Sequence, residues 1–418
     1  MIAVVGAGIA GLAAARELTR RGQQVVVLEA SGRVGGKVRA TEVGGLLVDE
    51  GADSMLRRVP WGVELAESVG LELVSPATGE AGIWWGGSLH PLPAGTVMGI
   101  PTDPATPEVE GEPVTEDLSV GELVRSRLGD EVVDRLVDPL LGGVYAGRAD
   151  RLSVQATLPQ LWPHLAAHRS LTAAARAARG TPAPGPVFAQ TAGGLGLLPP
   201  ALAEGLDVRL GTVVRGLERT PTGWRLETGS AADSSYEDAD AVVLAVPAAP
   251  AARLLKGIVP TDELAAVQYA SVGIITLVLD GPSPGRGSGL LIPAVEGRLT
   301  KAATFTSRKW DREGPAVVRA SVGRVGDEHD LQRDDEDLVR AVLADLADVV
   351  GPLPHVLASR VTRWGGALPQ YAPGHLDLVR RLRAALPTSL ALAGAAYDGV
   401  GVPAVARSGL DAARSLLP

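Results

Sequence analysis

The chain has 418 residues and no cysteine. This absence excludes disulfides, thiolate metal sites and a redox dithiol. The six histidines show no metal-binding spacing of the H-E-x-x-H type. His164 and His168 have a helical spacing, but no acidic residue lies beside them, which favours a polar helix face. We therefore expect no metal site.

The sequence also lacks a long basic stripe and a long apolar run. The net charge is −9, with acidic and basic residues interspersed, so we expect no nucleic-acid partner. No apolar run reaches 18 residues, and Ala241–Ala252, one of the longest, holds two prolines. We expect no integral membrane segment, no signal peptide before the first strand, and a soluble cytoplasmic protein with two or three subdomains.

What the chain does have is a nucleotide-binding pattern over residues 1–29. A short apolar strand leads into a G-x-G-x-x-G motif, an alanine-rich helix and a second strand that ends on Glu29. Gly6 permits the tight turn, Gly8 lets the backbone approach a pyrophosphate, and Gly11 lets helix and strand pack closely. Glu29 would accept hydrogen bonds from ribose hydroxyls. The pattern predicts a bound dinucleotide; the alternative is a glycine-rich turn without a ligand.

Two further glycine segments support this hypothesis. Arg33 precedes Gly35 and Gly36 within a few residues of Glu29, which suits a long, extended cofactor with the arginine near its phosphates. The alternative without a ligand is a glycine turn capped by a surface arginine. Near the end of the chain, residues 394–403 again read as strand, glycine loop and helix. The N-terminus of that helix would favour an anionic or electron-accepting group such as a reduced flavin ring. The alternative is a terminal helix that only completes the Rossmann layer.

The rest of the chain alternates between strands and helices, so the nucleotide domain is assembled from the start, middle and end of the sequence. Ser119-x-x-Glu122 is a capping box before a helical pattern, and residues 102–117 hold six acids, three prolines and no basic residue, as in a solvent loop. We predict strands at 43–49, 208–217, 239–247, 269–279, 317–322 and 390–394, a hairpin at 83–90, and helices at 61–69, 119–137, 335–350 and up to 416, with 152–179 largely helical.

Taken together, the first glycine motif, Glu29, residues 33–36 and the 394–401 tail resemble the FAD-binding amine oxidase and protoporphyrinogen oxidase superfamily. Interior segments resemble its bacterial porphyrinogen oxidase branch, over nearly the whole chain. These segments are 89–93, 97–101, 139–147, 156–160, 306–310, 319–323, and 363–364 with 367–371. Enzymes of the Gram-positive and actinobacterial type in that branch oxidise coproporphyrinogen III to coproporphyrin III.

The resemblance implies an α/β fold of the two-dinucleotide-binding type. It implies a Rossmann-like FAD-binding domain (1–75, 189–255 and 356–418), a mixed-sheet substrate domain (76–95 and 256–355) and a small helical domain (96–188). The implied cofactor site contains Gly6, Gly8, Ile9, Ala10, Gly11, Glu29, Ala30, Arg33, Gly35, Gly36, Lys37, Val213, Gly394, Gly401 and Val402.

The implied reaction passes hydride from a meso carbon of a porphyrinogen to flavin N5, with dioxygen reoxidising the flavin to give peroxide. No side chain stands out as an obligate general base, so we assign none. Protoporphyrinogen IX oxidation is an alternative within the branch. Outside it, the alternatives are an amine or amino-acid oxidase or a carotenoid-type desaturase, and a non-catalytic FAD-binding protein.

Two positions refine the comparison with the family. Amine oxidases usually carry a lysine on the strand that corresponds to Ser271–Leu279, near Ile274, and this strand has none. That departure argues against an amine substrate. Relatives usually also carry a longer helical insertion that helps cover the substrate cavity and in some meets the membrane. Only the acidic stretch 102–117 stands in its place here.

The four propionates of coproporphyrinogen III would need local positive charge despite the net −9. Candidates are two pairs of basic residues: Arg57 with Arg58, and Arg308 with Lys309. The alternative is that these pairs lie on a solvated face.

Overall fold

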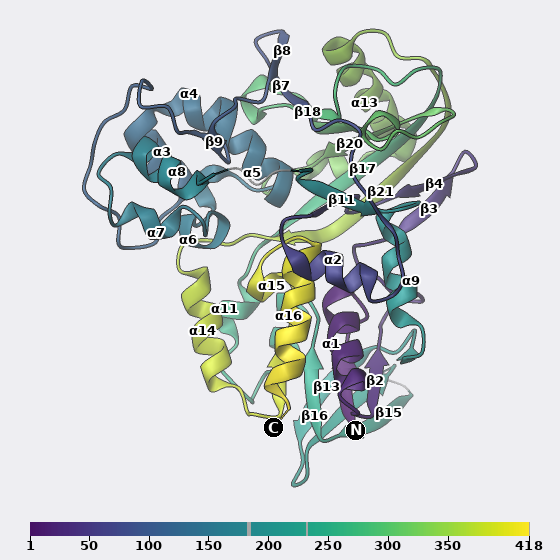
Figure 1. Ribbon diagram of the computed structural model, residues 1–418. Helices are drawn as coiled ribbons and strands as arrows, with labels where there is room; N and C mark the ends of the chain where they lie inside the picture. The colour runs from purple at the N-terminus through teal and green to yellow at the C-terminus, as the bar shows by residue number, and fades with distance from the viewer. Residues whose placement is uncertain (182–184, 231–232, 418) are drawn as a thin grey trace.

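A parallel sheet of five strands forms the lower half of the molecule in Figure 1, in the order β12-β2-β1-β16-β22. The computed structural model describes residues 1–181, 185–230 and 233–417. The start, middle and end of the chain all contribute to this sheet, as the sequence predicted. Its strands are β1 (Ile2–Val5), β2 (Val25–Leu28), β12 (Asp207–Arg209), β16 (Ala241–Leu244) and β22 (Leu390–Leu392).

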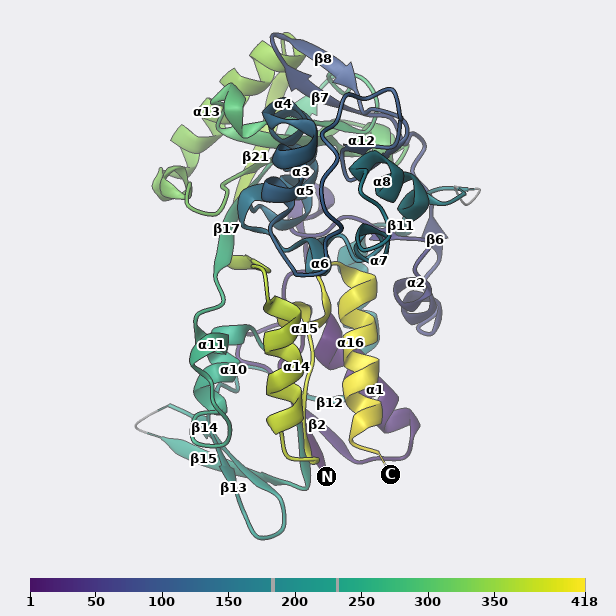
Figure 2. The ribbon, with the colours of Figure 1, turned by 90° about the vertical axis from the view of Figure 1, so that its left-hand side faces the viewer.

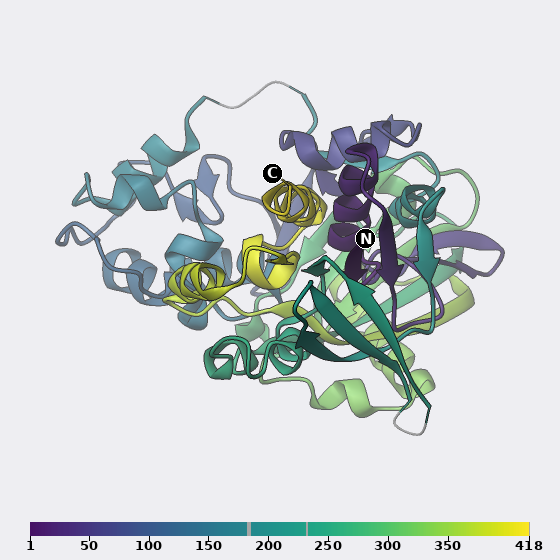
Figure 3. The same ribbon diagram turned by 90° about the horizontal axis from the view of Figure 1, so that it is seen from below.

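Two helices cover one face of this sheet, α1 (Ile9–Arg20) and α16 (Val402–Ser415). They approach so closely that a Cβ atom on Gly409 of α16 would overlap the carbonyl oxygen of Ala10. The other face packs against β13 (Val214–Arg219), β14 (Trp224–Gly229), β15 (Ser234–Ala239) and α10 (Ala248–Leu254). Figure 3 shows this layering from below, with the helices on one side and the antiparallel strands on the other.

The upper half of Figure 1 is built on a mixed sheet in the order β21-β17-β20-β19-β18-β7-β8. Helix α13 (Asp335–Val350), at the bounds that the sequence predicted, covers one face of it. The predicted hairpin is also confirmed as β7 and β8. The strands are β7 (Ala81–Trp85), β8 (Ser88–Pro91), β17 (Tyr269–Asp280), β18 (Gly289–Leu291), β19 (Thr300–Phe305), β20 (Ala316–Val322) and β21 (His355–Pro369).

Strand β21 changes one of the domain boundaries expected from the sequence. The boundary at residue 356 would assign this strand to the cofactor-binding domain. In the structure β21 pairs with β17 along its length, from Pro369 opposite Tyr269 to His355 opposite Asp280. We therefore move this boundary to the end of β21, and the other domain boundaries stay a prediction.

The single strand expected over residues 43–49 is wrong. The structure has a hairpin of β3 (Ala40–Val43) and β4 (Leu46–Asp49). Gly44 and Gly45 form its turn with φ of 57° and 78°, a conformation that glycine adopts without steric cost. The hairpin packs over the second face of the mixed sheet, where Val43 and Val48 contact Val278 and Val317.

The helical part lies beside the mixed sheet and above α14 to α16, as Figure 2 shows. Its first helix, α3 (Val120–Leu128), begins at Ser119, whose Oγ accepts from the N–H of Glu122 at 3.1 Å, as the capping box predicted. The stretch 152–179 is less continuous than expected. It forms three separate helices, α6 (Val154–Thr157), α7 (Trp162–Leu165) and α8 (Leu171–Arg179), because Pro159 interrupts the first and Ser170 caps the last.

Within the described part of the chain, no helix is long and apolar enough to cross a membrane. The remaining elements connect the layers described above. They are α2 (Pro60–Glu67), α4 (Asp130–Val132), α5 (Asp138–Tyr145), α9 (Leu198–Ala203), α11 (Asp262–Ala265), α12 (Thr306–Lys309), α14 (His375–Ala385), α15 (Ala395–Asp398), β5 (Met55–Leu56), β6 (Leu73–Val74), β9 (Thr96–Val97), β10 (Ile100–Pro101) and β11 (Phe188–Thr191).

Candidate functional site

The glycine motif lies in the turn between β1 and α1, at the carboxyl edge of the parallel sheet. A Cβ atom on Gly11 would overlap the carbonyl oxygen of Gly6, so Gly11 is needed for close packing of helix and strand. Gly8, the N-cap of α1, has no heavy atom within 4 Å of the position of such a Cβ. The space beside Gly8 is therefore open, and the free N–H groups of Ile9 and Ala10 begin the helix there.

Glu29 directly follows the last residue of β2 and lies beside this turn. One of its carboxylate oxygens accepts from the N–H of Ala7 at 2.7 Å and the other from the N–H of Ser31 at 2.9 Å. Both oxygens are fixed in place and keep a further lone pair for ribose hydroxyls. The carbonyl oxygen of Glu29 accepts from the N–H of Thr212 at 2.8 Å, so Ala30 and the half-exposed Val213 lie at the same edge.

The second glycine turn packs directly against the first. The N–H of Gly35 donates to the carbonyl oxygen of Ala7 at 2.8 Å, and a Cβ atom on Gly36 would lie 3.3 Å from the Cα of Gly8. The guanidinium of Arg33 donates to the carbonyl oxygen of Gly36 at 3.1 Å. The structure thus brings the two predicted glycine segments together around one space.

Lys37 follows this turn, and its side chain reaches the surface of the protein. Its Nζ lies 5.5 Å from the centre of the Tyr269 ring, and no hydrogen bond to it is found in the described part of the chain. Burial lowers the pKa of Lys37 to about 8. An ammonium group that has no acceptor among the described residues is free to donate to a polar or anionic ligand.

The C-terminal glycine segment reaches the same place from the other side. A Cβ atom on Gly394 would lie 4.0 Å from the Cβ of Ala10, and Gly401 is the N-cap of α16 with open space around it. Helices α1 and α16 therefore both begin at this edge, with the first N–H groups of each unpaired within the helix. Val402 is the first residue of α16 and is buried.

These features fit a flavin dinucleotide. The open space at Gly8, the fixed carboxylate of Glu29, two helix N-termini and the ammonium of Lys37 match a long ligand with a pyrophosphate, a ribose and a polar ring.

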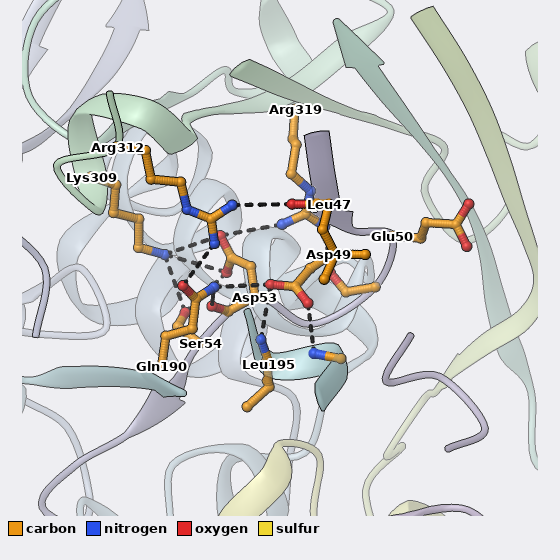
Figure 4. A network of polar contacts seen from close by, with 12 residues as sticks. Leu47, Asp49, Glu50, Asp53, Ser54, Gln190, Leu195, Lys309, Arg312 and Arg319 are labelled. Carbon is orange, nitrogen blue, oxygen red and sulfur yellow. Dashed lines mark hydrogen bonds and ion pairs between the residues drawn. The ribbon is translucent and has the colours of Figure 1, made fainter. Parts of the chain in front are cut away.

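Beyond the glycine turns, the loop after β4 passes between the two sheets and carries a network of charges (Figure 4). The Asp53 carboxylate lies 3.3 Å from the Nζ of Lys309 and 3.2 Å from an Nη of Arg319. Burial alone would raise the pKa of Asp53, but the charges of Lys309 and Arg319 lower it to about 2. Arg319 also donates to the carbonyl oxygen of Gly51, so this loop is fastened to β20.

A second carboxylate in Figure 4, at the end of β4, fastens the start of the same loop to β11 and to the chain that follows it. Asp49 accepts from Nε2 of Gln190 at 2.9 Å and from the N–H groups of Leu195 at 3.1 Å and Gly196 at 2.7 Å. The Gln190 amide also donates to the carbonyl oxygen of Asp53 at 2.7 Å. Sequence reasoning missed this network, because its members are far apart in the chain.

Next to this loop, the face of the mixed sheet opposite α13 is only partly covered. Alternation along β17 and β20 places Thr276 opposite Arg319 under the Gly51 loop. One step further, Ile274 lies opposite Ser321, and Ser321 pairs with Ala302 on the other side. Ile274, Ser321 and Ala302 are half-buried, and this stretch, which we call the open face, carries the lysine-free position noted in the sequence.

The four basic residues suggested for propionate binding do not gather at the open face. Arg57 and Arg58 are exposed, and Arg57 donates to Oγ of Ser75 at 3.2 Å. Arg308 is exposed and donates to the carbonyl oxygen of Ser283 at 2.9 Å. Only Lys309 is mostly buried, and its charge is paired with Asp53. A role for these four in substrate binding stays a prediction.

The chain is similar to known proteins along nearly its whole length. The family described as flavin containing amine oxidoreductase matches residues 9–417. The chain is 38% identical to the coproporphyrinogen III oxidase of Mycobacterium tuberculosis (strain ATCC 25618 / H37Rv) over 96% of this chain and 94% of that protein. It is 32% identical to the coproporphyrinogen III oxidase of Bacillus subtilis (strain 168), with the same coverage.

Solved structures agree with this comparison. A crystal structure from Exiguobacterium sp. 255-15, provisionally named a protoporphyrinogen oxidase, is similar with a TM-score of 0.88 and 32% identity, covering 99% of this chain and 98% of that one. A putrescine oxidase is similar with a TM-score of 0.75 and 19% identity, covering 100% of this chain and 98% of that one. The second likeness shows the fold alone.

Proposed function

Because the chain belongs to the flavin containing amine oxidoreductase family and is a flavin-dependent oxidoreductase, we propose that it uses FAD to oxidise coproporphyrinogen III to coproporphyrin III. Dioxygen is the proposed oxidant, so that one porphyrinogen and three dioxygen molecules give one porphyrin and three molecules of hydrogen peroxide. The observation that carries this proposal is the similarity to coproporphyrinogen III oxidases along 96% of the chain. The lysine-free open face agrees with it.

In this proposal the chain's own residues bind and orient. Glu29 holds a ribose, the N–H groups at the start of α1 hold the pyrophosphate, and Lys37 meets the polar side of the cofactor. When bound, FAD supplies the two-electron acceptor for each of the three cycles. The Gly51 loop, fastened by Arg319 and Asp53, sets the distance between the glycine turns and the open face.

The experiment is an aerobic assay of the flavin-loaded protein with coproporphyrinogen III, followed by porphyrin fluorescence and by peroxide. We expect porphyrin and peroxide in a ratio of about one to three, by the electron balance of the reaction. The same protein stripped of flavin is the control. Turnover of amines or amino acids in place of porphyrinogens would favour an oxidase of another class. A flavin that photoreduces and reoxidises without any turnover would favour a non-catalytic protein.

The second candidate substrate is protoporphyrinogen IX, favoured by the name given to the Exiguobacterium structure at 32% identity. It has two propionates where coproporphyrinogen III has four. Values of kcat/KM measured for both porphyrinogens on one preparation decide between them. We expect coproporphyrinogen III to have the higher value.

We further propose that the enzyme works in the cytoplasm on a small-molecule substrate, with no nucleic-acid partner. The acidic segment 102–117 supports this, because anionic lipid headgroups and nucleic acid would both repel it. In the structure it lies along the helical part, where Glu108 accepts from the N–H of Thr172 at 3.0 Å and Glu112 pairs with Arg169 at 2.8 Å.

A further inference from the structure

Two buried basic side chains lie at one end of the open face. Along β20, Ser321 is followed by Arg324, just past the end of the strand, and Lys301 of β19 lies beside it. Lys301 is the extra residue of a β-bulge, since Thr300 pairs with Val322 and Ala302 pairs with Ser321. Their exposed fractions are only 7% for Lys301 and 6% for Arg324. Bulges that redirect a side chain are common next to functional sites.

Neither cation is neutralised by a carboxylate. The Nζ of Lys301 donates to the carbonyl oxygen of Gly323 at 2.6 Å, and an Nη of Arg324 donates to the carbonyl oxygen of Ile292 at 3.0 Å. Within the described ranges, no carboxylate oxygen lies within 4.0 Å of either charged group. One carbonyl oxygen accepts from each group and does not balance its charge, so two basic groups lie buried side by side, which is strongly unfavourable while both are charged.

The opposite end of the open face shows the contrast. There, Arg319 and Lys309 are also mostly buried, but the Asp53 carboxylate lies between them at 3.2 and 3.3 Å. The protein therefore supplies its own counter-charge at the Gly51 end. At the Lys301 end it does not.

The other charged groups around Lys301 and Arg324 do not neutralise the excess of positive charge. Asp138 at the start of α5 accepts from the N–H of Ala149 at 2.8 Å and lies 3.8 Å from Nε of Arg148, so it already faces a third cation. Burial raises the pKa of Asp138, which weakens it further as a counter-ion. Asp327, beyond Arg324, is exposed to solvent. Three cations thus face one buried carboxylate.

We propose that Lys301 and Arg324 form a carboxylate-binding site that holds one propionate of the tetrapyrrole, with the macrocycle lying over Ile274 and Ser321. The site rests on the proposed function and adds to it the group that fixes the substrate's orientation. A propionate supplies the charge that the protein lacks at this end, while the apolar macrocycle covers the half-buried open face.

This site differs from the pairs that the sequence suggested. Arg57, Arg58 and Arg308 are exposed, where water screens an ion pair and weakens it, and Lys309 is neutralised by Asp53. Lys301 and Arg324 are buried, where a charge-assisted hydrogen bond is strong and specific.

The test measures binding of coproporphyrin III, the stable proposed product, to the flavin-loaded protein by porphyrin fluorescence. Lys301→Gln keeps a donor for the Gly323 carbonyl and removes the charge. Lys256→Gln makes the same change at an exposed lysine and is the matched control. We expect Kd to rise about tenfold to a hundredfold for Lys301→Gln and Arg324→Gln, and to stay unchanged for Lys256→Gln. KM for coproporphyrinogen III should rise in parallel, with kcat changed less.

The tetramethyl ester of coproporphyrin III separates charge from structure, because it keeps the macrocycle and has no carboxylate. We expect wild type and Lys301→Gln to bind the ester equally. Equal Kd values of wild type and Lys301→Gln for the free acid would overturn the site, and so would equal weakening of acid and ester, which would indicate a structural role. Flavin content and melting temperature show whether a variant is misfolded. If Arg324→Gln is misfolded, the comparison of Lys301→Gln with wild type decides whether the carboxylate site exists.

Failure of the proposed function can be distinguished from failure of the carboxylate site alone. If the wild-type protein retains flavin but neither binds coproporphyrin III nor oxidises the porphyrinogen, the proposed function fails and the carboxylate site fails with it. If wild type oxidises the porphyrinogen and Lys301→Gln does so with unchanged KM, only the carboxylate site fails.

Discussion

At the scale of single residues, the glycines of the first motif have separable roles. The Cβ position of Gly8 is open in the protein, whereas a Cβ on Gly11 would overlap the backbone of Gly6. Gly8→Val should therefore fold and yet lose the flavin, because its branched side chain occupies the space of the pyrophosphate. We expect a colourless protein with a melting temperature near that of flavin-stripped wild type.

Gly11→Val is the matched contrast for this prediction. It should lower the stability of the protein itself, since the helix must move away from β1 to make room. Absorbance of the purified proteins and thermal unfolding of both variants provide the comparison. A full complement of flavin in Gly8→Val would show that this loop does not hold the pyrophosphate.

Lys301 also predicts a pH dependence of stability. Burial, together with the neighbouring charge of Arg324, lowers its pKa to about 7 from an ordinary value of 10.5. Between these values the unfolded chain binds more protons than the folded one, so this lysine makes stability rise with pH from about 7 towards 10. Lys301→Met should remove that contribution and raise the melting temperature most at pH 7 and below. Thermal unfolding without substrate at pH 7 and 9, with Lys256→Met as control, measures it; an equal effect at both pH values contradicts it.

At the scale of elements, the loop after β4 joins the two halves of the molecule. Its Asp53 is paired with Arg319 of β20 and Lys309 of α12. Asp53→Asn leaves these cations without a counter-charge and should cost about 3–5 kcal/mol of stability, as breaking a buried ion pair does. Denaturant unfolding measures this loss, and Asp280→Asn, at an exposed position that ends β17, is the control.

The acid range gives a second readout for the same pair. The pKa of Asp53 is lowered to about 2, so its contribution to stability is present above about pH 4 and is lost as the pH falls through 2. The difference in stability between wild type and Asp53→Asn should shrink over that range. A difference that is independent of pH would mean that Asp53 is not charged in the folded protein.

Elements with a strong local signal could be predicted from the sequence. The unit β1–α1–β2, the capped start of α3 and the whole of α13 follow from periodicity and capping residues. The hairpin of β3 and β4 could not be seen, because residues 43–49 read as one apolar strand and the turn depends on two glycines at positive φ. Lys301 was also missed, since a bulge is set by pairing with β20 and not by its neighbours in the chain.

At the scale of the whole molecule, the site exists only where the two sheets meet. The cofactor half could be predicted because its glycines and Glu29 lie close together in the sequence. The substrate half joins residues far apart, such as Asp53 with Lys309 and Lys301 with Gly323. The folded structure determines which of these cations has a carboxylate partner. No local sequence pattern predicts it.

The distribution of charge over the molecule also predicts how it behaves in a lysate. Because the net charge is −9 and the acidic segment 102–117 lies on the helical part, we expect the enzyme in the supernatant of a lysate prepared without detergent. We expect it to be fully active in that fraction. Fractionation with and without detergent measures activity in supernatant and pellet. Recovery mainly in the pellet, released only by detergent, would contradict this.

The most direct test of the proposed function is anaerobic mixing of the flavin-loaded protein with coproporphyrinogen III while the flavin absorbance is recorded. We expect the oxidised flavin band to be bleached, with one porphyrin formed for about three flavins reduced, and dioxygen to restore the band and give peroxide. If the flavin band stays unchanged with this substrate, in protein that is reduced normally by light, the proposed function is wrong.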